Sequence, residues 1–153
     1  FNTYGPRQSA RAIIPTIITQ IAAGKKTIDL GDTSPTRDFT FVKDICKGFV
    51  QVAESVKTIG QVLNLGSNFE ISIKDTFILI KKLMNTDIEL HIDDHRLRPG
   101  KSEVFRLWCN NEKSRDLIGF QPDFTFEQGL TETIAWYKNP ENLRKFKTDV
   151  YNI

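Results

Sequence analysis

Short apolar runs alternate with longer segments of helical periodicity along the chain, and this alternation constrains the fold more than any other feature. Strands are predicted from the Ile, Leu, Val, Phe and Thr content of residues 27–30, 37–42, 61–67 and 88–92. The run QVLNLGS at 61–67 is bounded by glycines and predicts a buried strand. With 153 residues the chain can form one domain with one core, and the pattern predicts a mixed α/β fold with short connections.

Helices are predicted between these runs. The segment 9–26 carries isoleucines at helical spacing, with Pro15 in or near the first turn and Gly24 as a stop signal. Residues 42–56 place four apolar side chains at i, i+4, i+7 and i+11, namely Ile45, Phe49, Val52 and Val56. Further helices are expected after three predicted caps: Ser72 with Asp75, Thr125 with Gln128, and Asn139 before Pro140.

Composition and charge argue against several classes of protein. The net charge is +2 without a basic stripe, so we expect no nucleic-acid partner. There is no run of about 18 apolar residues and no leader-like segment, so we expect a cytoplasmic protein with no membrane partner. The two cysteines, Cys46 and Cys109, have no CxxC spacing and are expected to be reduced thiols. Neither His91 nor His95 has a partner at ligand spacing, so no metal is expected.

Four polar residues lie where a predicted strand ends or a loop turns: Asn2, Arg7, Arg37 and Arg98. The planar guanidinium group of arginine matches two phosphate oxygens at once, so two arginines and an amide could hold one diphosphate. Taken singly, each arginine is more simply explained by a surface ion pair, Arg37 with Asp38 and Arg98 with Asp94. The irregular loop at about 93–104 contains Arg98 and is a candidate for function.

Motifs for self-contained catalysis are missing from the sequence. It has no GxGxxG, GxxxxGK[ST], GxSxG or HExxH motif, and no Tyr is followed four residues later by Lys. The residues alone therefore predict a ligand-binding α/β unit with no catalytic residue of its own. Glu103 could orient a sugar hydroxyl or remain a solvated carboxylate.

Five motifs in order extend this interpretation: FNTYGPRQ, GDTSPTRDFTFV, QVLNLGS, RPGKSEV and NNEKSRDLIGFQP. Together they resemble the carboxyl-terminal half of extended short-chain dehydrogenases/reductases of the NAD-dependent epimerase/dehydratase family. The residues within these motifs are most similar to those of the nucleotide-sugar 4,6-dehydratases of the legionaminic acid pathway. The resemblance implies that residues 1–153 form the nucleotide-sugar-binding portion of an extended Rossmann-type enzyme. Residues 1–5 and about 60–67 would complete a sheet whose amino-terminal part is absent.

The resemblance also implies roles for individual residues. Substrate-binding positions would be Asn2, Ile28, Leu30, Arg37, Asn64 and Arg98. Phe1 would lie near the nicotinamide edge of NAD, which the missing amino-terminal half would mainly bind. That half would also carry the catalytic Tyr-x-x-x-Lys pair. The turn that is usually GDG in the family is GDT here, residues 31–33, which changes the backbone freedom ahead of Arg37.

The implied activity is 4,6-dehydration of UDP- or GDP-N-acetylglucosamine to a 4-keto-6-deoxy sugar nucleotide. The intact protein would be a homodimer, and the chain alone would be inactive. Three alternatives stay open: a 4-epimerase or UDP-glucuronate decarboxylase of the same fold, a stand-alone nucleotide-binding module, and a purely structural domain.

Overall fold

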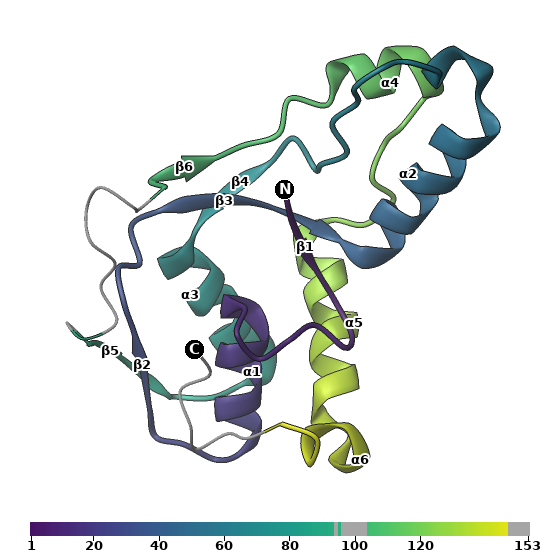
Figure 1. Ribbon diagram of the computed structural model, residues 1–153. Helices are drawn as coiled ribbons and strands as arrows, with labels where there is room; N and C mark the ends of the chain where they lie inside the picture. Colours follow the sequence, from purple (N-terminus) through teal and green to yellow (C-terminus); the bar gives the residue numbers. More distant parts are fainter. Residues whose placement is uncertain (94, 96–103, 147–153) are drawn as a thin grey trace.

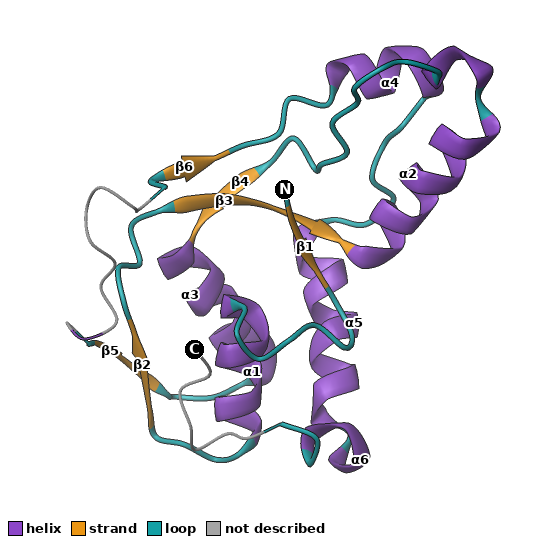
Figure 2. Ribbon diagram, viewed as in Figure 1, coloured by secondary structure: helices purple, strands orange, loops and turns teal. Residues whose placement is uncertain are grey.

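The computed structural model describes residues 1–93, 95 and 104–146, and it has the predicted mixed α/β architecture (Figures 1 and 2). Its helices are α1 (Ile13–Ala22), α2 (Val42–Glu54), α3 (Ile73–Met84), α4 (Glu112–Ile118), α5 (Phe126–Lys138) and α6 (Pro140–Leu143), with a 3-10 turn at Val56–Thr58. Its strands are β1 (Asn2–Tyr4), β2 (Thr27–Leu30), β3 (Thr36–Phe41), β4 (Glu70–Ser72), β5 (Glu89–Ile92) and β6 (Arg106–Leu107).

Strand β3 organises the larger of two sheets. It pairs with β1 in parallel, with β4 in antiparallel orientation and with β6 in parallel. In the smaller sheet β2 pairs with β5 in parallel. The register places Asn2 beside Phe39, so the start of the chain lies next to the middle of β3. The pairing therefore holds β1 and β3, which are far apart in the sequence, side by side.

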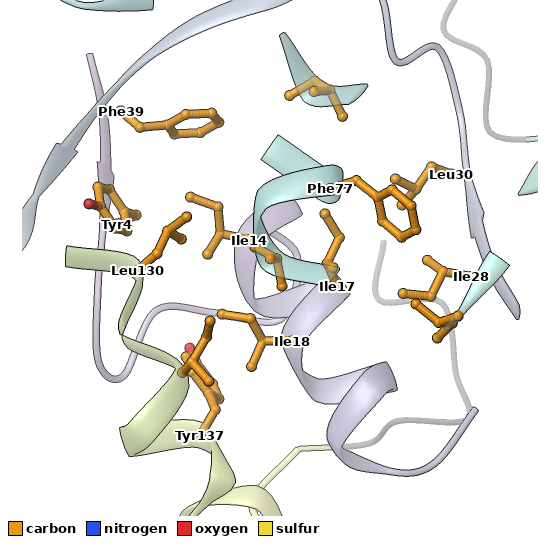
Figure 3. Packing of buried hydrophobic residues seen from close by; sticks show 14 of the residues in the cluster. Tyr4, Ile14, Ile17, Ile18, Ile28, Leu30, Phe39, Phe77, Leu130 and Tyr137 are labelled. Carbon is orange, nitrogen blue, oxygen red and sulfur yellow. The ribbon is translucent and has the colours of Figure 1, made fainter. Parts of the chain in front are cut away.

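The core is formed where α1, α3 and α5 pack against one another and against the two sheets (Figure 3). Helix α1 contributes Ile14, Ile17 and Ile18, all buried. The predicted helix at 9–26 is confirmed but shorter: Pro15 lies in its first turn, and Gly24 follows its end with φ +79°. Burial of these apolar side chains stabilises the helix more than its intrinsic propensity does.

The predicted capping residues are largely confirmed. The Ser72 hydroxyl accepts a hydrogen bond from the Asp75 N–H at the start of α3, and Thr125 with Gln128 forms a full capping box on α5. Asn139 caps α6 through the Glu141 N–H. Within the described residues no helix has the length and apolar character needed to cross a membrane.

Helix α2 and helix α4, with the 3-10 turn between them in space, form an arm that extends away from the α1, α3 and α5 cluster (Figure 1). We call α2 together with residues 55–62 the arm segment. Within α2 the chain packs closely at Gly48, where an added Cβ would lie 2.8 Å from the Phe120 ring and 2.9 Å from Leu65. The apolar face predicted for α2 is divided, because Val52 is partly buried whereas Phe49 is exposed.

The prediction of a buried strand at 61–67 is wrong for the described chain. The segment forms no strand, and its Val62 side chain is 83% exposed. A strand forms only where a neighbouring strand offers its edge. Here the backbone bonds elsewhere: the Asn64 carbonyl accepts from the Ser114 hydroxyl, and the Gly66 carbonyl accepts from the Asn111 amide at 2.9 Å. Whether the segment joins a larger sheet in a longer polypeptide stays a prediction.

Candidate functional site

A cavity of about 320 Å³ lies between the start of α1, the end of β2 and the middle of β3. Its wall combines amide and charged side chains with apolar ones: Asn2, Gln8, Arg11, Ala12, Ile13, Ile14, Thr16, Leu30, Gly31, Asp32, Pro35, Arg37, Phe39 and Ile73. A hollow that combines apolar walls with several convergent polar groups is typical of a small-molecule site.

The alternation of β3 decides which of its residues reach the cavity. Successive side chains of a strand point to opposite faces, so Arg37 and Phe39 share one face and line the cavity. The Arg37 guanidinium donates to the carbonyl of Thr36 at 2.8 Å, which holds its stem against the strand. Asp38 and Thr40 lie on the other face and are buried.

Asp38 fixes this strand to two distant segments. Its carboxylate accepts hydrogen bonds from the Ser67 N–H at 2.9 Å, the Ser67 hydroxyl at 2.7 Å, the Cys109 N–H at 3.2 Å and the Thr40 hydroxyl at 3.2 Å. Asp38 is fully buried, so these donors replace the water that an ionised carboxylate requires. Asp38, which the sequence suggests as an ion-pair partner of Arg37, therefore has a structural role on the face of β3 opposite Arg37.

Two buried amide atoms in the cavity wall have no hydrogen-bond partner among the described residues: Asn2 Nδ2 and Gln8 Oε1. The Gln8 Nε2 group donates to the carbonyl of Thr3 at 2.8 Å, which fixes the orientation of that side chain. A buried donor and a buried acceptor left unpaired are costly, and they occur at sites that a ligand or further chain completes.

The electrostatics of the cavity favour an anionic group. Arg11 and Arg37 both line it, and helix α1 begins there with no side-chain cap and no acidic residue in its first turn. Asp32 is the carboxylate in the cavity wall. The Ser34 N–H donates a hydrogen bond to this carboxylate, which lowers the pKa of Asp32. Sequence reasoning missed Gln8, which lies just before the predicted helix at 9–26, and Arg11, which lies in the first turn of that predicted helix.

The structure places the predicted substrate-binding residues at different distances from this cavity. Asn2, Leu30 and Arg37 line it. Ile28 is fully buried in the core and is not among the residues that line the cavity. Asn64 is exposed on the segment beside α4, where its amide donates to the carbonyl of Asn110 at 3.3 Å.

Other predicted residues lie elsewhere. Phe1 is 48% exposed at the start of β1, and neither it nor Arg7 lines the cavity. Arg7 is exposed and has a left-handed backbone conformation with φ 70°. Arg98 and Glu103 lie outside the described residues.

Arg106 links β6 to β4. Its guanidinium contacts Glu70 through Nη2 at 2.6 Å and through Nε at 2.9 and 3.0 Å, and it lies over the Trp108 ring. Hydrogen bonds from Arg106 and Thr36 lower the pKa of the Glu70 carboxyl. Arg106 is therefore engaged by the fold and is not presented to the cavity.

Asp44 on α2 gives a testable pH dependence. Burial raises the pKa of its carboxyl, one oxygen accepts from the Asp123 N–H at 2.8 Å, and the other has no partner among the described residues. A carboxyl whose pKa is raised by folding contributes stability below its unfolded pKa and loses it as pH rises through the folded pKa. The stability of the native protein relative to Asp44→Asn is therefore expected to fall as the pH rises above about 4, the pKa of an unperturbed Asp.

Urea denaturation of both proteins at several pH values checks this. The exposed Asp116→Asn variant is the control and should show no such trend. A difference between native protein and Asp44→Asn that is the same at every pH would contradict the prediction.

Solved structures with this arrangement are Rossmann-type epimerases and dehydratases, which confirms the predicted fold class. The chain belongs to the GDP-mannose 4,6 dehydratase family, whose model matches residues 1–133. The resemblance to NAD-dependent epimerases and dehydratases is thus confirmed, whereas the legionaminic acid branch stays a prediction.

Three relatives with different activities resemble the chain to a similar degree. A UDP-N-acetyl-alpha-D-glucosaminuronate decarboxylase of Bacillus cytotoxicus is 31% identical over 93% of this chain and 46% of its own length. The dTDP-glucose 4,6-dehydratase of Bacillus anthracis, solved in complex with NAD, is 32% identical with a TM-score of 0.80, over 95% of this chain and 45% of its own. A UDP-N-acetylglucosamine 4-epimerase of Methanobrevibacter ruminantium, solved with UDP-N-acetylmuramic acid, is 33% identical with a TM-score of 0.78, over 90% and 44%.

The chain spans less than half the length of each of these proteins. Identity alone does not separate the three activities, because all three relatives match the chain almost equally well.

Proposed function

We propose that this chain is the substrate-binding portion of an NAD-dependent nucleotide-sugar 4,6-dehydratase that acts on UDP- or GDP-N-acetylglucosamine. The observation that carries the proposal is the cavity in which Asn2, Arg11 and Arg37 meet at the start of α1. A diphosphate carries the charge and the paired oxygens that two guanidinium groups and an amide bind best.

The proposed division of roles follows from the wall of the cavity. Arg37 binds the diphosphate as a fork, Asn2 Nδ2 donates to a phosphoryl or sugar oxygen, and the strand end at Leu30 and Gly31 borders the base. Arg98 is proposed as a further arginine of the diphosphate site, beside Arg37 and Arg11, on the family resemblance alone. These groups position the sugar, so they act on affinity and orientation and not on bond breaking.

The cofactor belongs to another part of the proposed enzyme. The sequence has neither a glycine-rich dinucleotide motif nor a Tyr-x-x-x-Lys pair, so we assign NAD and the proton-transferring residues to a preceding half of a longer polypeptide. NAD would supply transient oxidation of the sugar. Residues 1–5 and about 60–67 would complete the sheet of that half, and Phe1 would approach the nicotinamide edge.

The first experiment incubates the full-length gene product with UDP- and GDP-N-acetylglucosamine in D2O and follows the sugar by proton NMR. A growing C6 methyl signal with loss of the C6 methylene is expected for one of the two nucleotides. Heat-denatured enzyme is the control. If no methyl signal appears with either donor, the dehydratase proposal fails.

The same spectra test one related activity: a new anomeric signal with the C6 methylene retained would identify a 4-epimerase. A separate incubation with UDP-glucuronate tests the other. Release of carbon dioxide, with loss of the C5 carboxylate from the sugar, would identify a decarboxylase. Each outcome would leave the proposed diphosphate site in place, because that site does not depend on the reaction at the sugar.

A further inference from the structure

Three hydrogen bonds hold Gln8, which follows β1 and precedes α1. Its N–H donates to the carbonyl of Gly5 at 3.3 Å, which closes the turn after β1. Its carbonyl accepts from the Tyr137 hydroxyl of α5 at 2.5 Å, and its Nε2 group donates to the carbonyl of Thr3 at 2.8 Å. Gln8 is therefore fixed in one orientation relative to both β1 and α5.

One polar atom of this fixed side chain is unused. Gln8 Oε1 is buried and has no hydrogen-bond partner among the described residues, and Gln8 lines the cavity. Turning the amide round would break the bond from Nε2 to Thr3, so the atom in this position stays an acceptor. A ligand satisfies this acceptor only if it brings a hydrogen-bond donor, and an unsatisfied buried acceptor is costly.

Gln8 lies at the same end of the cavity as Asn2. The register of β1 and β3 places Asn2 beside Phe39, and both of these residues line the cavity. Gln8 binds the residue that follows Asn2, so the two amides are neighbours. Asn2 Nδ2 is an unpartnered donor among the described residues, and Gln8 Oε1 is an unpartnered acceptor. Such a pair of neutral groups suits a group that both donates and accepts, as a sugar does, better than it suits a phosphate, which only accepts.

Arg37 and the end of β2 give the order of groups along the cavity. Arg37 lies two residues before Phe39 in β3, and Pro35 lies two residues before Arg37. Pro35 lines the cavity together with Leu30 and Gly31, to which the proposed function assigns the base. With the diphosphate at Arg37, between these two ends, a base at one end leaves the sugar at the other.

We infer that Gln8 is a specificity-determining residue, whose Oε1 accepts a hydrogen bond from the hexose of the bound sugar nucleotide. The inference rests on the proposed function for the places of the diphosphate and the base. The donor is the N–H of a 2-acetamido group or a sugar hydroxyl, since these are the groups of such a hexose that can donate. A hexose with no donor at this place would leave Oε1 unpaired, and sites that hydrogen-bond their substrates reject analogues in this way.

Calorimetric titration of the full-length gene product tests the inference. The protein is saturated with NADH, which cannot accept a hydride from the sugar, so binding is measured without turnover. UDP, UDP-N-acetylglucosamine and their GDP counterparts are titrated into the native protein and into Gln8→Met. Methionine has a similar length but no amide oxygen. We therefore expect the Kd of the sugar nucleotide to rise at least about fivefold, and the Kd of UDP or GDP to stay within about twofold.

Gln121→Met is the matched control, because Gln121 is exposed and does not line the cavity. It should leave every Kd unchanged. Equal losses of affinity for the nucleotide and the sugar nucleotide in Gln8→Met would show that Gln8 only shapes its loop, and would overturn the inference. Unchanged affinity for both would overturn it as well.

A second sugar identifies the donor. UDP-2-deoxyglucose has no hydrogen-bond donor at C2. If Gln8→Met weakens binding of UDP-N-acetylglucosamine but not of UDP-2-deoxyglucose, the bond comes from the acetamido N–H. If it weakens binding of both, the bond comes from a hydroxyl elsewhere on the ring. Both results support the role of Gln8.

A crystal structure of the native full-length protein with NADH and the sugar nucleotide that binds needs no variant. A nitrogen or oxygen atom of the sugar is expected within about 3.2 Å of Gln8 Oε1. A water molecule or a protein donor at Oε1, with the sugar bound elsewhere, would overturn the inference.

These tests do not use turnover, so they separate the inference from the proposed dehydratase. An effect of Gln8→Met confined to sugar nucleotides, with no methyl signal by NMR, would retain Gln8 as a sugar-binding residue and reject the dehydratase. A methyl signal without such an effect would do the reverse.

Discussion

Asp38→Ala is expected to lower the free energy of unfolding by about 3 to 5 kcal/mol, the largest effect of any single change considered. The variant removes the acceptor for four hydrogen bonds and leaves the buried Cys109 N–H and the Ser67 N–H unsatisfied. Each such buried donor costs about 1 to 3 kcal/mol when its partner is lost. Urea denaturation followed by tryptophan fluorescence measures the change.

Two further variants make this result specific to the hydrogen bonds. Asp38→Asn keeps the shape but turns one acceptor into a donor that faces an N–H group, so an intermediate loss is expected. Asp116→Ala removes an exposed carboxylate on α4 and should change stability by no more than about 0.5 kcal/mol. A loss for Asp38→Ala as small as that of Asp116→Ala would contradict the role assigned to Asp38.

Arg37→Ala is expected to weaken binding of UDP or GDP to the full-length protein by about 1.5 to 3 kcal/mol, which is roughly 10-fold to 150-fold in Kd. The guanidinium lines the cavity on the face of β3 opposite Asp38, so its loss should affect the ligand more than the fold. Arg37→Lys keeps the charge but lacks the fork and should also bind less tightly. Isothermal titration calorimetry with both nucleotides gives the values.

Arg115→Ala is the matched control for this measurement. Arg115 is an exposed arginine on α4, paired with Asp116 and absent from the cavity wall, so its removal should leave nucleotide affinity unchanged. Unchanged affinity in Arg37→Ala, with the far-UV circular dichroism of the native protein, would remove Arg37 from the proposed site.

Sequence motifs predict only some of the residues that line the cavity. The FNTYGPRQ motif contains both Asn2 and Gln8, yet the sequence analysis predicts a binding role only for the amide of Asn2. Arg11 carries no motif of its own, and the structure places it just before α1, where it lines the cavity together with residues of β2 and β3. Ile28 and Leu30 lie on the same strand, but Leu30 alone of the two lines the cavity, at the end of β2.

The sequence by itself determined the elements whose signals are local. The helical spacing of the isoleucines in α1 and the caps at Ser72 and Thr125 depend on neighbours within a few residues, so those helices were predictable. The alternation along β3 is equally local.

Only the tertiary structure decided what depends on distant partners. The β1 and β3 register brings Asn2 beside Phe39, and this long-range pairing assembles the cavity. The segment 61–67 has the composition of a strand but forms none, because no described strand offers it an edge. The periodicity of α2 predicts one apolar face, yet the structure partly buries Val52 and leaves Phe49 exposed. Burial depends on what lies next to each side chain, and here the helix is covered where Gly48 packs against Phe120.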